Sequence, residues 1–396
     1  MASSCLFFIS LFLIISAQED SEIIEYDSIG TLSQYLNFDQ FSPSPLNDAS
    51  CPSYACKTSK MTFDKNQCVY YDAADNAYYA KKCSTKDTHC NITLNANSVC
   101  IPDPEPDIIL NYPGESCKSS DNCFNSFPCV NKVCQGLSQG ESCSNTIFCD
   151  VGLYCNTPTA GQNGTCQAQI DIGKSGCSVD FDCVNGAGCN VLTPGYSTSN
   201  ECIAYHSIPP HQAVGTCDVH SMSELCQSEY CESLKGVNYC TNLLNSTQKI
   251  PVKCNANTPC LSAADDFFEA DPFQINDNCV CGFNKDRTAY CPIFPGDSPR
   301  VKLRIQQDKW LSSTKINSCH TIRRFAPECQ KLYWNSDDFY ALEYYRAYSM
   351  LFPFVQDAQD CILQTFFIDY YNTKKSYNDD GAVSIVISAI LLGFII

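Results

Sequence analysis

The stretch that decides the fold is GESCKSSDNCFNSFPCVNKVC at residues 114–134, because its first four letters return in GESCSNTIFCDVGLYCNTPTAGQNGTC at residues 140–166. The spacing is Cys117-x5-Cys123-x5-Cys129-x4-Cys134 in the first and Cys143-x5-Cys149-x5-Cys155-x10-Cys166 in the second. GKSGC begins a third copy, Cys177-x5-Cys183-x5-Cys189-x12-Cys202, and GTC a looser fourth, Cys217-x8-Cys226-x4-Cys231-x8-Cys240. Residues 114–240 therefore contain four tandem repeats of one small unit.

Each repeat carries four cysteines, so each can close two disulfides without its neighbours. A unit of this length cannot bury enough apolar surface to fold alone, and one bridge closing about 15 residues contributes roughly 3 kcal/mol. We therefore expect a linear array of disulfide-rich modules dominated by loops and short strands. The glycine ahead of the first cysteine should supply a turn with positive φ or a close backbone approach. All sixteen cysteines of residues 114–240 are predicted to be disulfide-bonded.

The cysteines on either side of the repeats suggest two further domains. Residues 51–101 hold six cysteines, an even number that predicts a self-contained module, and the proline-rich PDPEPD at 102–107 reads as its boundary. Residues 254–371 hold a group of five cysteines and a group of three. Because both groups are odd, a disulfide is expected to join them into one C-terminal domain.

The C-terminal domain should be mainly α-helical. SDDFYALEYYRAYSMLF (336–352) has apolar residues at helical spacing, a cap at Ser336 and a stop at Pro353. The same period continues from Val355 to Phe366, and VKLRIQQDKWL (301–311) indicates another helix. We expect an aromatic core in this domain.

Both ends of the chain carry targeting features. The apolar run Leu6–Ile15, followed by Ser16 and Ala17, predicts a signal peptide at 1–17, ahead of an N-terminal arm at 18–50. The tail 372–396 contains the uncharged run AVSIVISAILLGFII (382–396) behind small polar residues, which resembles the signal exchanged for a glycosylphosphatidylinositol (GPI) anchor. Asn378 or Asp380 would carry the lipid; the alternative is a short transmembrane helix. Sequons at Asn91, Asn163 and Asn245 predict glycans.

The composition limits the possible functions. Cysteine supplies 31 of 396 residues, which fits an oxidising compartment, and loss of Cys5 with the signal peptide leaves an even thirty. The formal net charge of −18 disfavours nucleic acid and anionic lipid headgroups as partners. The adjacent Cys319 and His320 are interpreted as a bridged cysteine and an unrelated histidine, and Cys279, Cys281 and Cys291 as disulfide partners rather than zinc ligands. The sequence therefore predicts no catalytic, cofactor or metal site.

The repeats also carry a resemblance. CKSSDNCFNSFPCVNKVC and CSVDFDCVNGAGCN resemble the N-terminal cysteine-rich repeats of the Dickkopf family over about 114–202. The chain as a whole is similar to cysteine-rich surface proteins of protists. We predict a non-enzymatic extracellular protein displayed at the outer face of the plasma membrane, acting in surface coat, adhesion or recognition. The Dickkopf resemblance implies the alternative, an extracellular ligand or receptor regulator that uses loops between 117 and 202. A protein partner at the cell surface is expected, and the sequence leaves the oligomeric state open.

Overall fold

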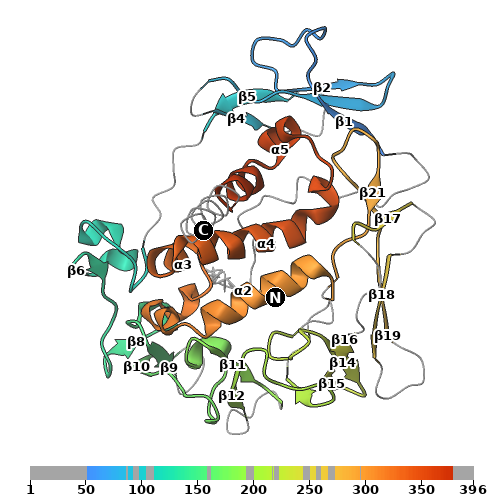
Figure 1. The fold of residues 1–396 in the computed structure, drawn as a ribbon. Helices are drawn as coiled ribbons and strands as arrows, with labels where there is room; N and C mark the ends of the chain where they lie inside the picture. Colours follow the sequence, from blue (N-terminus) through green and yellow to red (C-terminus); the bar gives the residue numbers. More distant parts are fainter. Residues whose placement is uncertain are drawn as a thin grey trace, which may run out of the picture.

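The computed structural model describes residues 51–377, apart from 86–87, 92–97, 104–110, 158–161, 193–199, 216, 218–222, 244–249, 256–259, 266–272 and 295. The predicted signal peptide, the N-terminal arm, most of the 102–107 boundary and the tail beyond residue 377 lie outside the described residues. Small sheets and loops surround a central group of helices near the C-terminus (Figure 1). The predicted fold class, disulfide-rich modules followed by a mainly α-helical region, is confirmed.

The four predicted repeats each form two crossed disulfides. In every one the first cysteine pairs with the third and the second with the fourth, and the third and fourth face each other across a hairpin. The eight bridges are Cys117–Cys129, Cys123–Cys134, Cys143–Cys155, Cys149–Cys166, Cys177–Cys189, Cys183–Cys202, Cys217–Cys231 and Cys226–Cys240. The sixteen predicted disulfide cysteines are thus confirmed.

The GESC motif closes each of the two repeats that carry it through its backbone. Gly114 and Gly140 both have φ +89°, as predicted, and the next amide closes a turn onto the carbonyl three residues earlier. The fourth cysteine then pairs with the motif: Cys134 N donates to Glu115 O at 2.9 Å, and Cys166 N donates to Glu141 O at 2.9 Å. The motif therefore joins the start of the repeat to its end.

Two more copies of this unit flank the predicted four. Cys68–Cys90 and Cys83–Cys100 have the same crossed order, and so do Cys254–Cys279 and Cys260–Cys291. The amide of the fourth cysteine again donates to the carbonyl two residues before the first cysteine, at Asn66 and at Val252. The chain therefore has six units, which we number by their cysteine limits: unit 1 (68–100), unit 2 (117–134), unit 3 (143–166), unit 4 (177–202), unit 5 (217–240) and unit 6 (254–291).

Two long-range disulfides correct the predicted pairing outside the repeats. Cys51 pairs with Cys281 and Cys56 with Cys361, so residues 51–101 are not self-contained. The groups of five and three cysteines are not joined to each other either, because each supplies its odd cysteine to the N-terminal segment. We call these two bridges the clamp bridges. Once one has formed, the other closes a loop of roughly 85 residues, worth about 4.6 kcal/mol in the loop-entropy model.

Packing of the first strand explains the clamp bridges. The strand β1 (Ser53–Cys56) pairs in parallel with β3 (Ala77–Ala80) and packs against the helix α5 (Asp360–Phe366). Tyr54 on β1 stacks on Phe283 of unit 6 with ring centroids 4.2 Å apart and meets Phe366 edge-on. This apolar contact brings Cys56, at the end of β1, and Cys51, two residues before its start, next to their distant partners.

The strands form eight small sheets among the described residues. The bounds are β1 Ser53–Cys56, β2 Val69–Asp72, β3 Ala77–Ala80, β4 Thr88–Asn91, β5 Val99–Pro102, β6 Cys129–Val130, β7 Val133–Cys134, β8 Ser142–Cys143, β9 Leu153–Asn156, β10 Gly164–Ala168, β11 Ala187–Asn190, β12 Glu201–Ala204, β13 Ala213–Val214, β14 Cys231–Leu234, β15 Val237–Cys240, β16 Asn242–Leu243, β17 Lys253–Cys254, β18 Cys260–Asp265, β19 Phe273–Asp277, β20 Val280–Cys281 and β21 Ala289–Tyr290.

The helical region, which we call the hub (298–377), contains α2 Ser298–Leu311, α3 Pro327–Tyr333, α4 Ser336–Val355, α5 Asp360–Phe366 and a last helix at 368–377. The predicted cap and stop of α4 are each displaced. Asn335, not Ser336, caps α4 by accepting from the Asp338 amide at 2.9 Å. Pro353 lies inside the last turn, and α4 ends where Asp357 adopts φ +59°.

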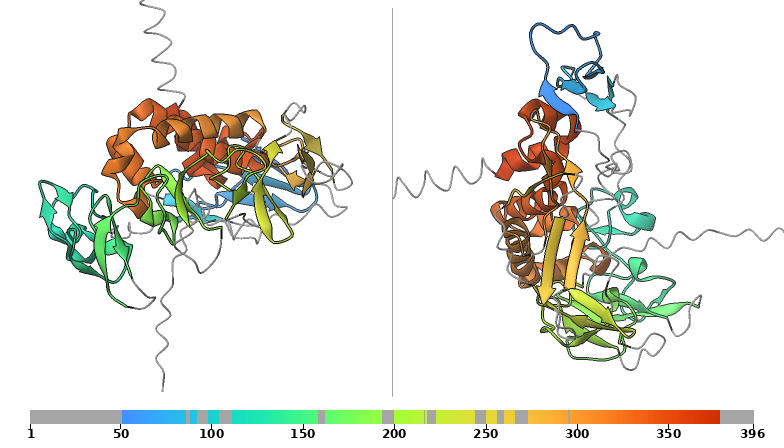
Figure 2. Two further views of the ribbon diagram at one scale, coloured as in Figure 1. Left: turned by 90° about the horizontal axis from the view of Figure 1, so that it is seen from below. Right: turned by 90° about the vertical axis from the view of Figure 1, so that its right-hand side faces the viewer.

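The six units encircle the hub rather than extending as the predicted linear array (Figure 1). Perpendicular views show the hub helices gathered on one side and most units on the other (Figure 2). The main apolar core, which includes Leu351, Ile362 and Leu363, joins the hub to unit 1 and unit 6. One side of the hub therefore forms a face of the molecule, and most of the units lie around the hub and toward the opposite face.

Candidate functional site at the hub

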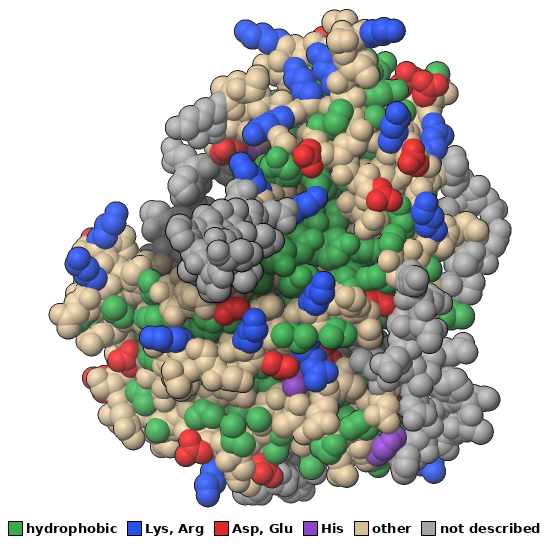
Figure 3. All heavy atoms as spheres, viewed as in Figure 1, with side chains coloured by type: hydrophobic (Ala, Val, Ile, Leu, Met, Phe, Trp, Pro, Cys, Tyr) green, Lys and Arg blue, Asp and Glu red, His purple; other side chains and the backbone are tan. Residues whose placement is uncertain are grey.

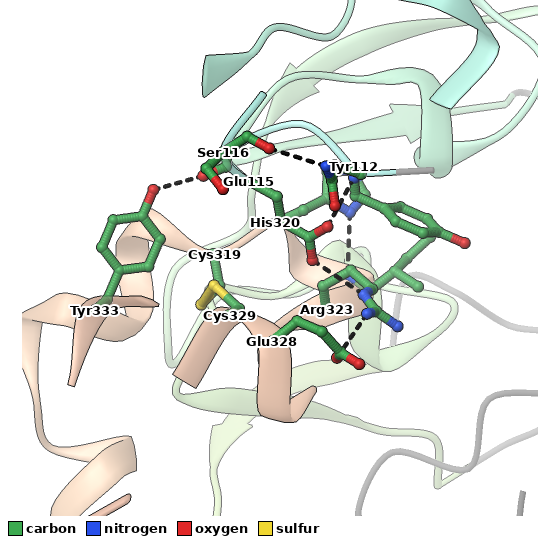
Figure 4. A network of polar contacts seen from close by, with 12 residues as sticks. Tyr112, Glu115, Ser116, Cys319, His320, Arg323, Glu328, Cys329 and Tyr333 are labelled. Carbon is green, nitrogen blue, oxygen red and sulfur yellow. Dashed lines mark hydrogen bonds and ion pairs between the residues drawn. A yellow bond between two sulfur atoms is a disulfide. The ribbon is translucent and has the colours of Figure 1, made fainter. Parts of the chain in front are cut away.

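Buried arginines join the hub to the units, and Figure 4 shows the first of these contacts. Arg323 Nε lies 3.2 Å from Glu115 Oε1, and its second terminal nitrogen lies 2.7 Å from Glu328 Oε2. The guanidinium also lies 5.0 Å from the centroid of the Tyr112 ring. Burial raises the pKa of Glu115, and the charge of Arg323 and the Tyr112 amide offset only part of that effect. The first GESC motif thus contributes a buried carboxylate to the hub.

His320 fixes the hub against unit 3. The imidazole is fully buried, its Nε2 lies 3.2 Å from Cys149 O, and its Nδ1 accepts from the Ile322 amide at 3.3 Å. Burial lowers the pKa of His320 to about 4, so the side chain is neutral at physiological pH. Its neighbour Cys319 is bridged to Cys329. The prediction that this pair is not a thiol nucleophile with its base is consistent with that bridge.

Arg324 and Asn185 join the hub to unit 4. Arg324 is 1% exposed, donates to Asp180 O at 3.1 Å and also hydrogen-bonds the Tyr205 hydroxyl. Asn185 Nδ2 donates in the other direction, to Ile316 O at 2.8 Å and to the carbonyl of Cys319 at 2.9 Å. The hub and unit 4 thus each donate hydrogen bonds to backbone carbonyls of the other, which lose contact with water where the two pack together.

A charged cluster joins α2 to unit 5. His206 Nδ1 lies 2.6 Å from Asp308 Oδ1, and His206 Nε2 lies 3.6 Å from Glu229 Oε1. Arg300 Nε reaches the same Glu229 carboxylate at 3.3 Å. On unit 6, the Tyr290 hydroxyl donates to Asp357 Oδ2 at 2.6 Å. The hub therefore makes specific polar contacts with units 2 to 6 and apolar contacts with unit 1.

These arrangements are suited to holding parts together. The five groups of three close sulfurs consist of crossed disulfides, so they present no thiolates to a metal. Cys279, Cys281 and Cys291 pair with Cys254, Cys51 and Cys260, in line with their predicted disulfide role. All thirty cysteines from Cys51 onward form fifteen disulfides.

The predicted modification sites have different positions. Asn91 is partly exposed at the end of β4, and Asn163 is exposed immediately before β10. Asn245, Asn378 and Asp380 lie outside the described residues. The stretch TIRRFAPEC (321–329), which supplies both buried arginines, was not singled out from the sequence. Its available signal was two adjacent arginines in a short segment between two cysteines.

The comparisons with known proteins assign no family. No family model matches the chain, and no solved structure matches it. The chain is similar to the prion-like-(Q/N-rich) domain-bearing protein 25 of Caenorhabditis elegans, with 25% identity over 158 residues. The match covers 39% of this chain and 21% of that protein. The chain thus covers about a fifth of that relative's length.

Proposed function

We propose that this is a non-enzymatic extracellular protein displayed at the outer face of the plasma membrane, where it acts in surface coat, adhesion or recognition. A GPI anchor attached at Asn378 or Asp380 would hold it there. The observation that carries the proposal is the set of fifteen disulfides, since extensive disulfides fit a secreted or extracellular protein. Among the described helices, none is long and apolar enough to cross a bilayer.

The contacts of the hub support a structural role for its buried arginines and for His320. Arg323, Arg324 and His320 each connect the hub with a unit, and each is less than a tenth exposed. A coat or recognition protein benefits from such docking, because it fixes the units and keeps their outer loops in place. The outer loops of the units are then available to a partner.

The test is the mass of the C-terminal tryptic peptide from protein recovered at the cell surface. Cleavage after Lys375 yields a peptide beginning at Ser376. A peptide that ends near Asn378 or Asp380 and carries a glycolipid supports the proposal, whereas a peptide intact to Ile396 overturns the lipid anchor. As matched variants, Leu391→Arg in the apolar run should abolish surface display, and Ser376→Arg outside the run should not.

A second candidate function is regulation of an extracellular ligand or receptor through the loops of the units. Unit 4 and the segment before it favour this reading, because Ile172, Val179 and Leu192 are 52%, 50% and 51% exposed. Exposed aliphatic side chains of this kind can anchor a protein partner. Cross-linking on intact cells tests it: one stoichiometric partner that is lost in an Ile172→Asp variant supports the regulator, and the absence of any partner contradicts it.

A further inference from the structure

The hub presents one broad surface that the units do not cover. The helices α2 and α4 lie antiparallel on it, since Lys309 Nζ is 2.9 Å from Asp338 Oδ1 at one end and Lys302 Nζ is 5.6 Å from the Tyr345 ring centroid at the other. Val301 and Ile305 project from α2 and are 45% and 49% exposed. Figure 3 shows apolar side chains gathered over the middle of this surface, with both basic and acidic side chains around them.

Tyrosines line the contact between α4 and the last helix. Tyr344 stacks on Tyr348 and on Tyr377, with ring centroids 5.6 Å and 4.7 Å apart. The hydroxyls of Tyr345 and Tyr377 are 3.1 Å apart. Tyr344, Tyr345, Tyr348 and Tyr377 are all partly exposed. We define the helical face by Val301, Lys302, Ile305, Lys309, Asp338, Tyr344, Tyr345, Tyr348 and Tyr377.

The hub and units 2 to 5 differ in net charge. The hub sequence has eleven Lys and Arg against eight Asp and Glu, whereas residues 114–240 have four against twelve. The net charge of −18 is therefore unevenly distributed along the chain, and the hub has a small positive excess. Three of the eleven hub cations, Arg323, Arg324 and Arg346, are buried, so the hub surface is close to neutral and repels phosphate groups less than units 2 to 5 do.

Chain length places the helical face close to the apolar segment. Tyr377 ends the last described helix, and the apolar run begins at Ala382. Those five peptide steps reach at most about 18 Å when fully extended. The alternative lipid-bearing residues, Asn378 and Asp380, are only one and three steps from Tyr377. Either form of attachment leaves the last helix as the part of the described body nearest to the anchor along the chain.

We propose that the helical face lies against the headgroup layer of a phospholipid bilayer, with the units directed away from the membrane. The inference rests on the proposed function, because it requires attachment through the C-terminal segment. Tyrosine suits this layer because its ring is apolar and its hydroxyl remains hydrated. Val301 and Ile305 enter between headgroups, and Lys302, whose ammonium lies over the Tyr345 ring, meets a lipid phosphate. The orientation presents the outer loops of the units to other cells or to soluble partners.

The experiment compares two single tryptophans on the full-length anchored protein. Ile305→Trp adds a tryptophan to the helical face, and the matched Ile172→Trp adds one next to unit 4; these isoleucines are 49% and 52% exposed. Each protein is reconstituted into phosphatidylcholine vesicles with or without bromine on the acyl chains. The two native tryptophans contribute the same background to both variants. Native disulfide formation is checked by electrophoresis without reductant.

The expected result is that brominated lipid removes most of the fluorescence added by Ile305→Trp and leaves that added by Ile172→Trp unchanged. Equal quenching of the two positions, or no quenching of either on vesicle-bound protein, would overturn the orientation. Vesicle flotation of the wild-type protein separates this failure from that of the proposed function. Protein that does not float refutes membrane attachment itself, and the orientation with it.

Discussion

The repeated GESC motif provides a paired perturbation, Gly114→Ala against Gly140→Ala. Both glycines have φ +89°, so an alanine at either position costs about 1 to 2 kcal/mol of backbone strain. The surroundings differ. A Cβ at Gly140 would have no atom within 4 Å, whereas a Cβ at Gly114 would lie 2.6 Å from Val151 Cγ2 and 2.8 Å from Ser318 O. Overpacking of that kind lowers the stability by about 1 to 3 kcal/mol more. The Ser318 carbonyl belongs to the backbone and cannot rotate away from the added Cβ.

We therefore expect Gly114→Ala to lower the free energy of unfolding by about 1 to 3 kcal/mol more than Gly140→Ala does. Urea unfolding, followed by the fluorescence of the two hub tryptophans, measures both losses in the same background. Hydrogen exchange of residues 314–323 provides a local check, since only Gly114→Ala should accelerate it. Equal losses in the two variants would refute the packing of Gly114 against Val151 of unit 3 and Ser318 of the hub, because these two contacts make the twin glycines different.

Three further predictions concern the hub and the clamp bridges. Glu115→Ala strips a buried partner from Arg323 and should cost about 3 kcal/mol, while the exposed Glu141→Ala should cost less than about 1 kcal/mol; equal costs in urea titrations would contradict the buried ion pair. Because the pKa of His320 falls from 6.5 to about 4 on folding, the unfolded chain binds more protons between these values, and stability should drop by about 3 kcal/mol on acidification through this window. His320→Asn should remove this part of the pH dependence of the free energy of unfolding. An unchanged pH dependence in that variant would refute the role of His320. Replacing both cysteines of either clamp bridge by alanine should lower the free energy of unfolding by about 5 kcal/mol, against about 3 kcal/mol for a bridge within a unit. A lower urea midpoint for the variant that lacks a bridge within a unit would contradict this role of the clamp bridges.

The regular spacing of the cysteines made units 2 to 5 predictable, whereas units 1 and 6 have a different spacing and were not recognised as copies of the same unit. In unit 1 the first two cysteines are 15 residues apart, and in unit 6 the hairpin β18–β19 separates the second from the third. Loops of such length cost little to close, so the crossed disulfides tolerate them. The even number of cysteines in residues 51–101 led to the wrong prediction of a self-contained module, because an even number is also compatible with two of those cysteines pairing elsewhere. Their partners are set by the packing of Tyr54 on Phe283, which no local pattern records.

The helices show the same division between local and tertiary information. Periodicity found α2 and α4, but the seven-residue α3 is too short to display a period. The contacts of Arg323 and Arg324 with units 2 and 4 join residues that are 208 and 144 positions apart. Two adjacent arginines in a sequence are more often solvated than buried, so their role became visible only with the fold.

The most direct test of the account is a disulfide map of the protein recovered from the surface of intact cells, digested without reduction. The account predicts peptides in which Cys51 is linked to Cys281 and Cys56 to Cys361, beside crossed pairs in all six units. Such a map would establish that the two clamp bridges join the N-terminal segment to unit 6 and to the hub. Linkage of Cys51 and Cys56 to cysteines within residues 68–100, or free thiols at these positions, would contradict it.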